Sequence, residues 1–298
     1  MSIDILQNKI RKMKNPSACG LDLSPELIPE TVRADALSRL GDTPAAAAES
    51  FRVFGAQVLD ALADVVPAVK FQPANYLRYG HAGAEALEEL CALAGKKGFY
   101  VIVDALRGDV ETTAEIASAA YFGADAPFPA DAVTLNGYTG SDGVKPYLPY
   151  CREQGKNVFL LVRSSNKSSR EVQDLISGDR VVHTVMADLA MRWSGDLIAK
   201  SGYSELGVIV GATHPAVLRA LREKYDRLFF LVPGYGAQGG TARDAQYAFD
   251  RFGRGALVCA SRSLIGAWQK EENGDYAALI RAAAEKMRSD LAGFVTVI

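Results

Sequence analysis

The sequence contains few of the residues that usually build metal sites and disulfides. Its 298 residues include four cysteines and three histidines. The cysteines, Cys19, Cys91, Cys151 and Cys259, are widely spaced without a CxxC pair, and no two histidines have HxxxH spacing. We therefore expect neither a metal site nor a disulfide. Cys19 and Cys259 lie in apolar runs, so we expect them to be buried free thiols.

A strong net charge and long apolar runs are also missing. The formal net charge of −2 gives no reason to expect binding to nucleic acid or to a membrane surface. No apolar run approaches the roughly 20 residues that cross a bilayer. The first segment, MSIDILQNKIRKMKNP, is amphipathic and has no apolar core of a signal peptide. We expect a cytoplasmic protein.

Short apolar runs, in contrast, recur along the whole chain. Eight strand-like runs alternate with segments in which Ala, Leu, Glu and Arg recur at helical spacing. The strand-like runs cover residues 18–22, 67–71, 99–104, 131–136, 157–163, 205–211, 228–232 and 256–260. The helical segments cover residues 45–65, 82–96, 110–122, 143–154, 180–202, 214–225, 241–252 and 275–294. Eight units in series predict an α/β protein with a single (β/α)8 barrel domain over residues 1–298.

Polar side chains and glycines gather directly after the predicted strands. Asp22 follows the first strand, Lys70 lies within the second, Asp104 ends the third, and Arg262 follows the eighth. The polar stretch 164–180 follows the fifth, and we expect it to be a mobile loop over the barrel mouth. Parallel barrels carry their chemistry at the carboxyl ends of the strands, so the functional site is expected there.

The segment PGYGAQGG after the seventh strand is the strongest local signal for phosphate binding. Closely spaced glycines allow backbone amides to converge on an anion, and a helix is expected to begin near Thr241. Arg262, which directly follows the eighth strand, could bind the same anion through two N–H groups of its guanidinium. The alternative is that these glycines only allow a tight turn.

Lys70 is unusual because it lies in an otherwise apolar strand, where a lysine is costly unless it is paired. It either extends its amine to the surface at the strand end or pairs with Asp104 and Asp109. If the third strand stays extended, Asp104 and Leu106 share the face that points into the site. Asp22 could instead cap the turn that follows it.

Several motifs in the same order resemble those of the long-chain group of orotidine 5′-phosphate decarboxylases. They are AVKFQ, the DxxxxD after the third strand, DAVTLNGYTGSDGVKPYL, VFLLVRSSN, GVIVGATHP, FLVPGYGAQGGTA and the pair Ser261 and Arg262. The resemblance runs from Ala18 to Arg262. It implies a homodimeric (β/α)8 barrel that decarboxylates orotidine monophosphate to uridine monophosphate in pyrimidine biosynthesis, without metal or organic cofactor.

The resemblance also implies roles for individual residues. The charged side chains of Lys70, Asp104 and Asp109 would surround the reacting carboxylate. Asp109 would reach in from the partner subunit. Asp22 and Thr113 would contact the ribose, and Ser165 would contact the pyrimidine edge. The phosphate would be bound by Gln238, Gly239 and Arg262.

Leu106 departs from the family pattern, in which this strand end reads Asp-x-Lys-x-x-Asp. The family lysine stabilises the carbanion and protonates it, whereas a leucine offers neither charge nor a proton. Two alternatives to a decarboxylase therefore stay open. The chain could be a non-catalytic paralogue that binds nucleotide monophosphates, or an enzyme acting on another phosphorylated substrate.

Overall fold

The computed structural model describes residues 2–271 and 275–298. Eight parallel strands close into a barrel in which neighbours follow the order β1-β10-β9-β8-β5-β4-β3-β2. The barrel strands are β1 (Ser17–Leu21), β2 (Ala68–Phe71), β3 (Tyr100–Arg107), β4 (Ala132–Leu135), β5 (Asn157–Arg163), β8 (Leu206–Val210), β9 (Phe230–Pro233) and β10 (Ala256–Ala260). The predicted (β/α)8 barrel is confirmed, and every predicted strand overlaps one of these.

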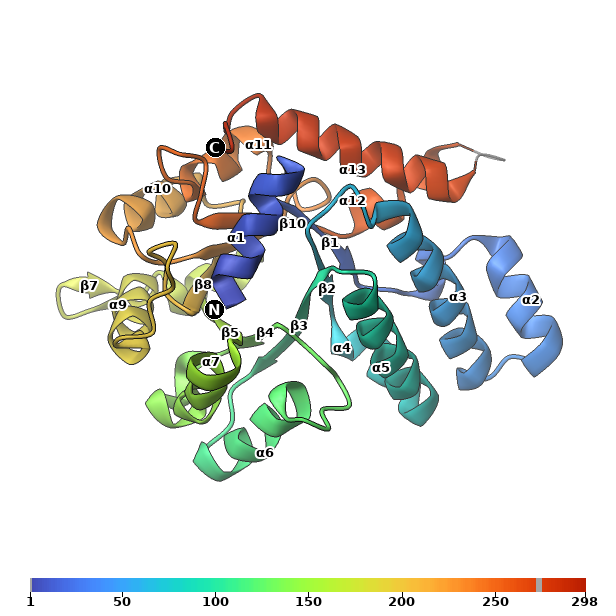
Figure 1. The fold of residues 1–298 in the computed structure, drawn as a ribbon, viewed down its shortest axis with the longest axis horizontal. Helices are drawn as coiled ribbons and strands as arrows, with labels where there is room; N and C mark the ends of the chain where they lie inside the picture. The colour runs from blue at the N-terminus through green and yellow to red at the C-terminus, as the bar shows by residue number, and fades with distance from the viewer. Residues whose placement is uncertain (1, 272–274) are drawn as a thin grey trace.

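Helices surround the barrel, as Figure 1 shows. They are α1 (Ser2–Met13), α2 (Glu30–Leu40), α3 (Pro44–Leu62), α4 (Pro73–Leu77), α5 (Gly80–Lys96), α6 (Glu111–Phe122), α7 (Leu148–Gln154), α8 (Arg170–Gln173), α9 (Val182–Ser194), α10 (Pro215–Lys224), α11 (Ala242–Ala245), α12 (Arg262–Ile265) and α13 (Tyr276–Ala292). Local sequence explains several boundaries. Thr43 caps α3 by accepting from the amide of Ala46, and Asp275 caps α13 by accepting from the amides of Ala277 and Ala278.

The predicted helix over residues 241–252 is much shorter in the structure. Helix α11 ends at Ala245 and is followed by one 3-10 turn. The chain then turns around Asp250, whose Oδ1 accepts from the amides of Phe252 at 2.8 Å and Arg254 at 2.9 Å. An aspartate that binds backbone amides ahead of it competes with helix formation, which accounts for the early end.

The stretch 164–180, predicted as a loop, is partly built from regular elements. It contains a 3-10 turn over Lys167–Ser169, helix α8 and an antiparallel hairpin of β6 (Ile176–Ser177) and β7 (Arg180–Val181). Arg163, only 3% exposed, anchors it through a 2.9 Å ion pair with Asp174. The prediction of a mobile loop over the barrel mouth missed these short elements and the buried arginine that anchors them, while its mobility stays a prediction.

Helix α1 closes the barrel at the amino ends of the strands. In Figure 1 it crosses in front of the barrel. Ile3, Leu6 and Ile10 recur on one face of the helix and are fully buried in the core. Apolar side chains at this spacing form a stripe that packs onto the barrel. The opposite end of the barrel, at the carboxyl ends of the strands, carries the polar loops.

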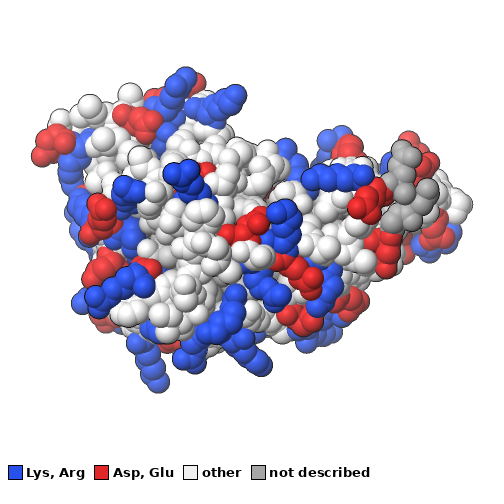
Figure 2. Space-filling model, turned by 90° about the horizontal axis from the view of Figure 1, so that it is seen from above, with Lys and Arg blue, Asp and Glu red and all other residues white. Residues whose placement is uncertain are grey.

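The charges on the surface are mixed. Figure 2 shows lysines and arginines interspersed with aspartates and glutamates over the face in view. Within residues 2–271 and 275–298, no helix is both long and apolar enough to span a membrane.

Candidate active site

A cavity of about 330 Å³ opens at the carboxyl ends of the barrel strands. Residues from seven of the eight strands or from the loops after them line it. They are Asp22, Lys70, Gln72, Asp104, Leu106, Leu161, Ser164, Ser165, Ile209, Pro233, Gly234, Tyr235, Ala237, Gln238, Cys259, Ala260, Ser261 and Arg262. The sequence placed functional polarity at this end, and the structure brings most of those residues into one cavity.

Lys70 lies at the centre of the charged part of the cavity. Its Nζ is 2.9 Å from Asp22 Oδ1 and 2.9 Å from Asp104 Oδ2, and the residue is only 5% exposed. Burial alone would lower the pKa of Lys70, but the charges of Asp104 and Asp22 outweigh burial and raise this pKa well above its ordinary value. Lys70 therefore remains a cation and is paired, rather than extended to the surface.

Asp104 is held in place from β4. The hydroxyl of Thr134 donates to Asp104 Oδ1 at 2.7 Å and accepts from the amide of Leu106 at 2.9 Å. Thr134 is fully buried, so its hydroxyl has no access to water. One side chain thereby fixes both the carboxylate of Asp104 and the backbone two residues beyond it.

The end of β3 is not an extended strand, which corrects the expected alternation. Its pairing with β4 shifts between Val103 and Arg107, and Leu106 adopts a left-handed φ of 45°. Such a backbone costs a non-glycine residue about 1–2 kcal/mol. Leu106 still lines the cavity beside Asp104 and is 40% exposed. The predicted outcome for Leu106 is correct, but a bulge produces it rather than simple alternation.

Asp109 and Thr113 do not line this cavity in the single chain. The carboxylate of Asp109 binds Arg107 instead, with its Oδ2 2.6 Å from Nε and its Oδ1 2.8 Å from Nη2. Thr113 lies on the exposed surface of α6. The structure therefore pairs Lys70 with Asp22 rather than with Asp109, and the implied roles of Asp109 and Thr113 remain predictions.

The glycine-rich loop over residues 233–240 needs its glycines for their backbone angles. Gly234, Gly236 and Gly239 have φ values of 100°, 73° and 93°, in a region that disfavours other residues. The amide of Gly239 donates to the carbonyl of Gly236 at 2.8 Å, and Gly239 lies outside the cavity lining. In this geometry Gly239 shapes the turn, while Gln238 faces the cavity.

Three polar side chains converge where this loop meets the end of β10. Gln238, Ser261 and Arg262 all line the cavity. The hydroxyl of Ser261 is buried and has no hydrogen-bond partner among the described residues. Arg262 is exposed and forms no ion pair with a described carboxylate. A hydroxyl, an amide and a guanidinium with unused donors are groups that can bind an anion.

Some cavity residues gave no clear signal in the sequence. Leu161 and Ile209 form apolar parts of the wall, and as hydrophobic residues in strands they resembled ordinary core. Thr134 could have been noticed as a polar residue inside the predicted strand 131–136. Cys259 also lines the cavity, where burial raises the pKa of its thiol to about 12 and keeps it neutral.

The described residues contain no group of three or more His, Cys, Asp or Glu side chains that could hold a metal ion. All four cysteines are buried and free, which confirms the prediction for Cys19 and Cys259. His214 contacts the carbonyl of Ser164 through Nε2 at 3.0 Å but does not line the cavity.

Comparison with known proteins agrees with this geometry. A family model described as "Orotidine 5'-phosphate decarboxylase / HUMPS family" matches residues 55–277. The chain belongs to this family. It is 35% identical over 294 residues to the orotidine 5′-phosphate decarboxylase of Clostridium perfringens (strain SM101 / Type A), covering 98% of each chain. The match to the Clostridium acetobutylicum enzyme of the same name is 38% over 241 residues, with 80% of this chain and 83% of that one covered.

The fold of this decarboxylase-family chain is also that of a solved relative. It superposes on the structure of Leishmania donovani OMP decarboxylase with a TM-score of 0.75 at 28% identity, covering 99% of this chain and 98% of that one. The barrel and its order of elements are thus those of the family.

Proposed function

We propose that the cavity binds orotidine 5′-monophosphate and uridine 5′-monophosphate. The protein would act in cytoplasmic pyrimidine biosynthesis, without a cofactor. The phosphate would lie at Gln238, Ser261 and Arg262, and the pyrimidine would lie toward Lys70 and Asp104. The observation that carries this proposal is the single cavity that joins unused anion-binding donors to a buried lysine held by two carboxylates. Binding energy from the remote phosphate could then act on chemistry at the charged end.

We further propose that Leu106 stands at the position of the family's catalytic lysine and makes decarboxylation slow. Its side chain faces the cavity next to Asp104, where it can neither stabilise a carbanion nor protonate it. Lys70 is a poor substitute, because Asp104 and Asp22 raise its pKa and so disfavour release of its proton. These contacts favour a protein that binds the nucleotide but turns it over slowly.

Exposed apolar side chains near Asp109 support a homodimer. Val110, directly before α6, is 62% exposed, Ile116 on α6 is 76% exposed, and Tyr138 in the loop after β4 is 88% exposed. Large apolar side chains this exposed are what a protein interface would cover. A second copy covering them would bring Asp109 and Thr113 toward the site of its partner, as the resemblance implies.

Calorimetric titration with uridine 5′-monophosphate tests the binding proposal. We expect saturable binding to the intact protein and an affinity loss of about 10–100-fold in Arg262→Ala, because the guanidinium binds the phosphate. Arg251→Ala removes an exposed arginine outside the cavity and should bind like the unaltered protein. Pentose or hexulose phosphates that bind more tightly than the nucleotide would instead favour a sugar-phosphate substrate.

A further inference from the structure

A second cavity, of about 440 Å³, lies at the opposite end of the barrel. It is bounded by α1, by the loop before β8 and by the turn before β10. Its lining residues are Asp4, Ile5, Gln7, Asn8, Arg11, Lys200, Ser201 and Arg254. None of them lines the candidate active site, and no proposed step of the decarboxylase chemistry uses them.

Gln7 is the unusual residue of this cavity. It is only 7% exposed, and its Oε1 accepts from the amide of Gly255 at 3.2 Å. That contact fixes the orientation of the side-chain amide, since the backbone amide can only donate. The Nε2 group of Gln7 is buried and has no acceptor among the described residues. Leaving such a donor unsatisfied typically costs about 1–3 kcal/mol, which a ligand oxygen would recover.

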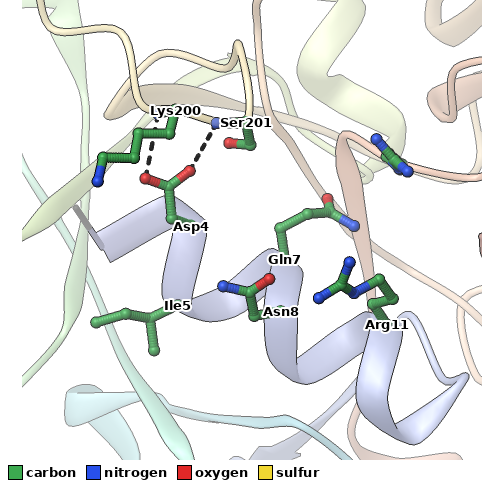
Figure 3. A pocket seen from close by; sticks show the side chains of 8 residues that line it. Asp4, Ile5, Gln7, Asn8, Arg11, Lys200 and Ser201 are labelled. Carbon is green, nitrogen blue, oxygen red and sulfur yellow. Dashed lines mark hydrogen bonds between the residues drawn. The ribbon is translucent and has the colours of Figure 1, made fainter.

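Three cations share the lining of this cavity with Gln7. Arg11, Lys200 and Arg254 all line the cavity, and none of their side chains forms an ion pair within the described part of the chain. The one acidic lining residue, Asp4, accepts from the amides of Lys200 at 3.1 Å and Ser201 at 2.8 Å. Figure 3 shows Asp4 facing that loop, with Gln7 and Arg11 further along the same helix. The cavity therefore has a surplus of positive charge and unused donors.

We propose that this cavity binds a phosphate-bearing small molecule. Two guanidinium forks and the Gln7 amide match the several oxygens of a phosphate group, and the Lys200 amine adds to the positive charge of the lining. The volume exceeds that of a bare ion, and Ile5, 50% exposed, supplies an apolar wall for an attached organic group. Because Gln7 and Arg11 lie on α1, the bound ligand would also stabilise the packing of this helix against the end of the barrel.

Calorimetric titration of the full-length protein with inorganic phosphate, and separately with glycerol 3-phosphate, tests this site. The Arg262→Ala background weakens phosphate binding at the candidate active site. We expect one remaining equivalent to bind and to weaken at least about 10-fold in both Arg11→Gln and Arg254→Gln. Tighter binding of the ester would assign a phosphate ester as the ligand, and equal binding would assign free phosphate.

Two further variants make the test specific. Gln7→Glu keeps the acceptor for Gly255 but replaces the unused donor with a negative charge, so it should abolish binding. Lys12→Gln removes one exposed charge from α1 outside the cavity and should leave the affinity unchanged. Binding that survives Arg11→Gln and Arg254→Gln, or falls equally in Lys12→Gln, would overturn the site, as would no binding in the Arg262→Ala background.

Discussion

The two ends of the barrel bury ionisable groups in opposite ways. At the carboxyl ends, Lys70 is 2.9 Å from each of two carboxylates, which raise its pKa and keep it charged. At the amino ends, Glu205 is fully buried and accepts from the amide of Ile3 at 3.1 Å, with no described lysine or arginine paired to it. Burial raises the pKa of Glu205 to about 7.

The difference lies in the partners rather than in the depth of burial. Charge is maintained where neighbouring side chains offset the desolvation cost, and it is weakened where they do not. The charge of Lys70 is therefore maintained at the carboxyl ends of the strands. At the other end the apolar face of α1 contributes stability, and Glu205 makes that stability dependent on pH.

The largest effect is expected from restoring a cation at the carboxyl ends. Leu106→Lys should raise the rate of CO2 release from orotidine 5′-phosphate by roughly 10²–10⁴-fold, because the lysine can stabilise the carbanion and protonate it. Leu106→Met preserves size without charge and should give no gain. A lysine variant no faster than the methionine variant would contradict the assignment of this position.

Removing the existing cation should expose the opposing charges. Lys70→Met leaves the partly buried carboxylates of Asp22 and Asp104 facing each other without their cation, and we expect it to lower the free energy of unfolding by about 3–5 kcal/mol in urea denaturation. Lys97→Met breaks only the exposed ion pair with Asp60 and should cost about 1 kcal/mol or less. Equal losses in the two variants would show that the Lys70 pairs do not differ from a surface contact.

The amino end should respond to pH. The folded-state pKa of Glu205, about 7, exceeds its ordinary value of 4.5, so the folded state binds the proton more tightly. The stabilisation that comes from this proton is fully present below pH 4.5 and is lost as the pH rises through about 7. Glu205→Gln should therefore gain roughly 2–3 kcal/mol over the unaltered protein between pH 5 and pH 8. Exposed Glu171→Gln is the control, and a similar pH response in both variants would refute the role of Glu205.

The smallest effect is expected at Thr134. Thr134→Val preserves the shape of the side chain but removes the hydroxyl that binds Asp104 and the Leu106 amide. We expect a loss of about 1–2 kcal/mol in the free energy of unfolding, measured by denaturation. Thr139→Val, at an exposed position, should change stability by no more than about 0.5 kcal/mol. A neutral result at Thr134 would mean that the bulge at Leu106 does not depend on this hydroxyl.

The barrel could be predicted from the sequence because eight strand-like runs alternate with helical segments along the chain. The charged cavity could be anticipated in part, since Lys70 is a costly residue in an apolar strand and Arg262 follows another strand. The pairing of Lys70 with Asp22 could not be predicted, because ion pairs between neighbouring strands depend on strand register rather than on local pattern. The anchoring of 164–180 by Arg163 is likewise a tertiary contact.

The bulge at the end of β3 shows the same limit. Alternation assumes an extended backbone, whereas Leu106 has a left-handed conformation supported by Thr134 on the neighbouring strand. Gln7 is similar, since its unsatisfied amide is visible only once α1 is packed against the barrel. Local patterns therefore predicted the elements and the end of the barrel where the polar cavity opens, but not the contacts between elements.

The most direct test of the central claim is CO2 release from saturating orotidine 5′-phosphate by the unaltered protein, with uridine 5′-monophosphate binding measured on the same sample. We predict nucleotide binding with turnover at least about 10²-fold slower than that of Leu106→Lys under the same conditions. Efficient turnover by the unaltered protein would contradict the claim, because a group other than residue 106 would then supply the proton.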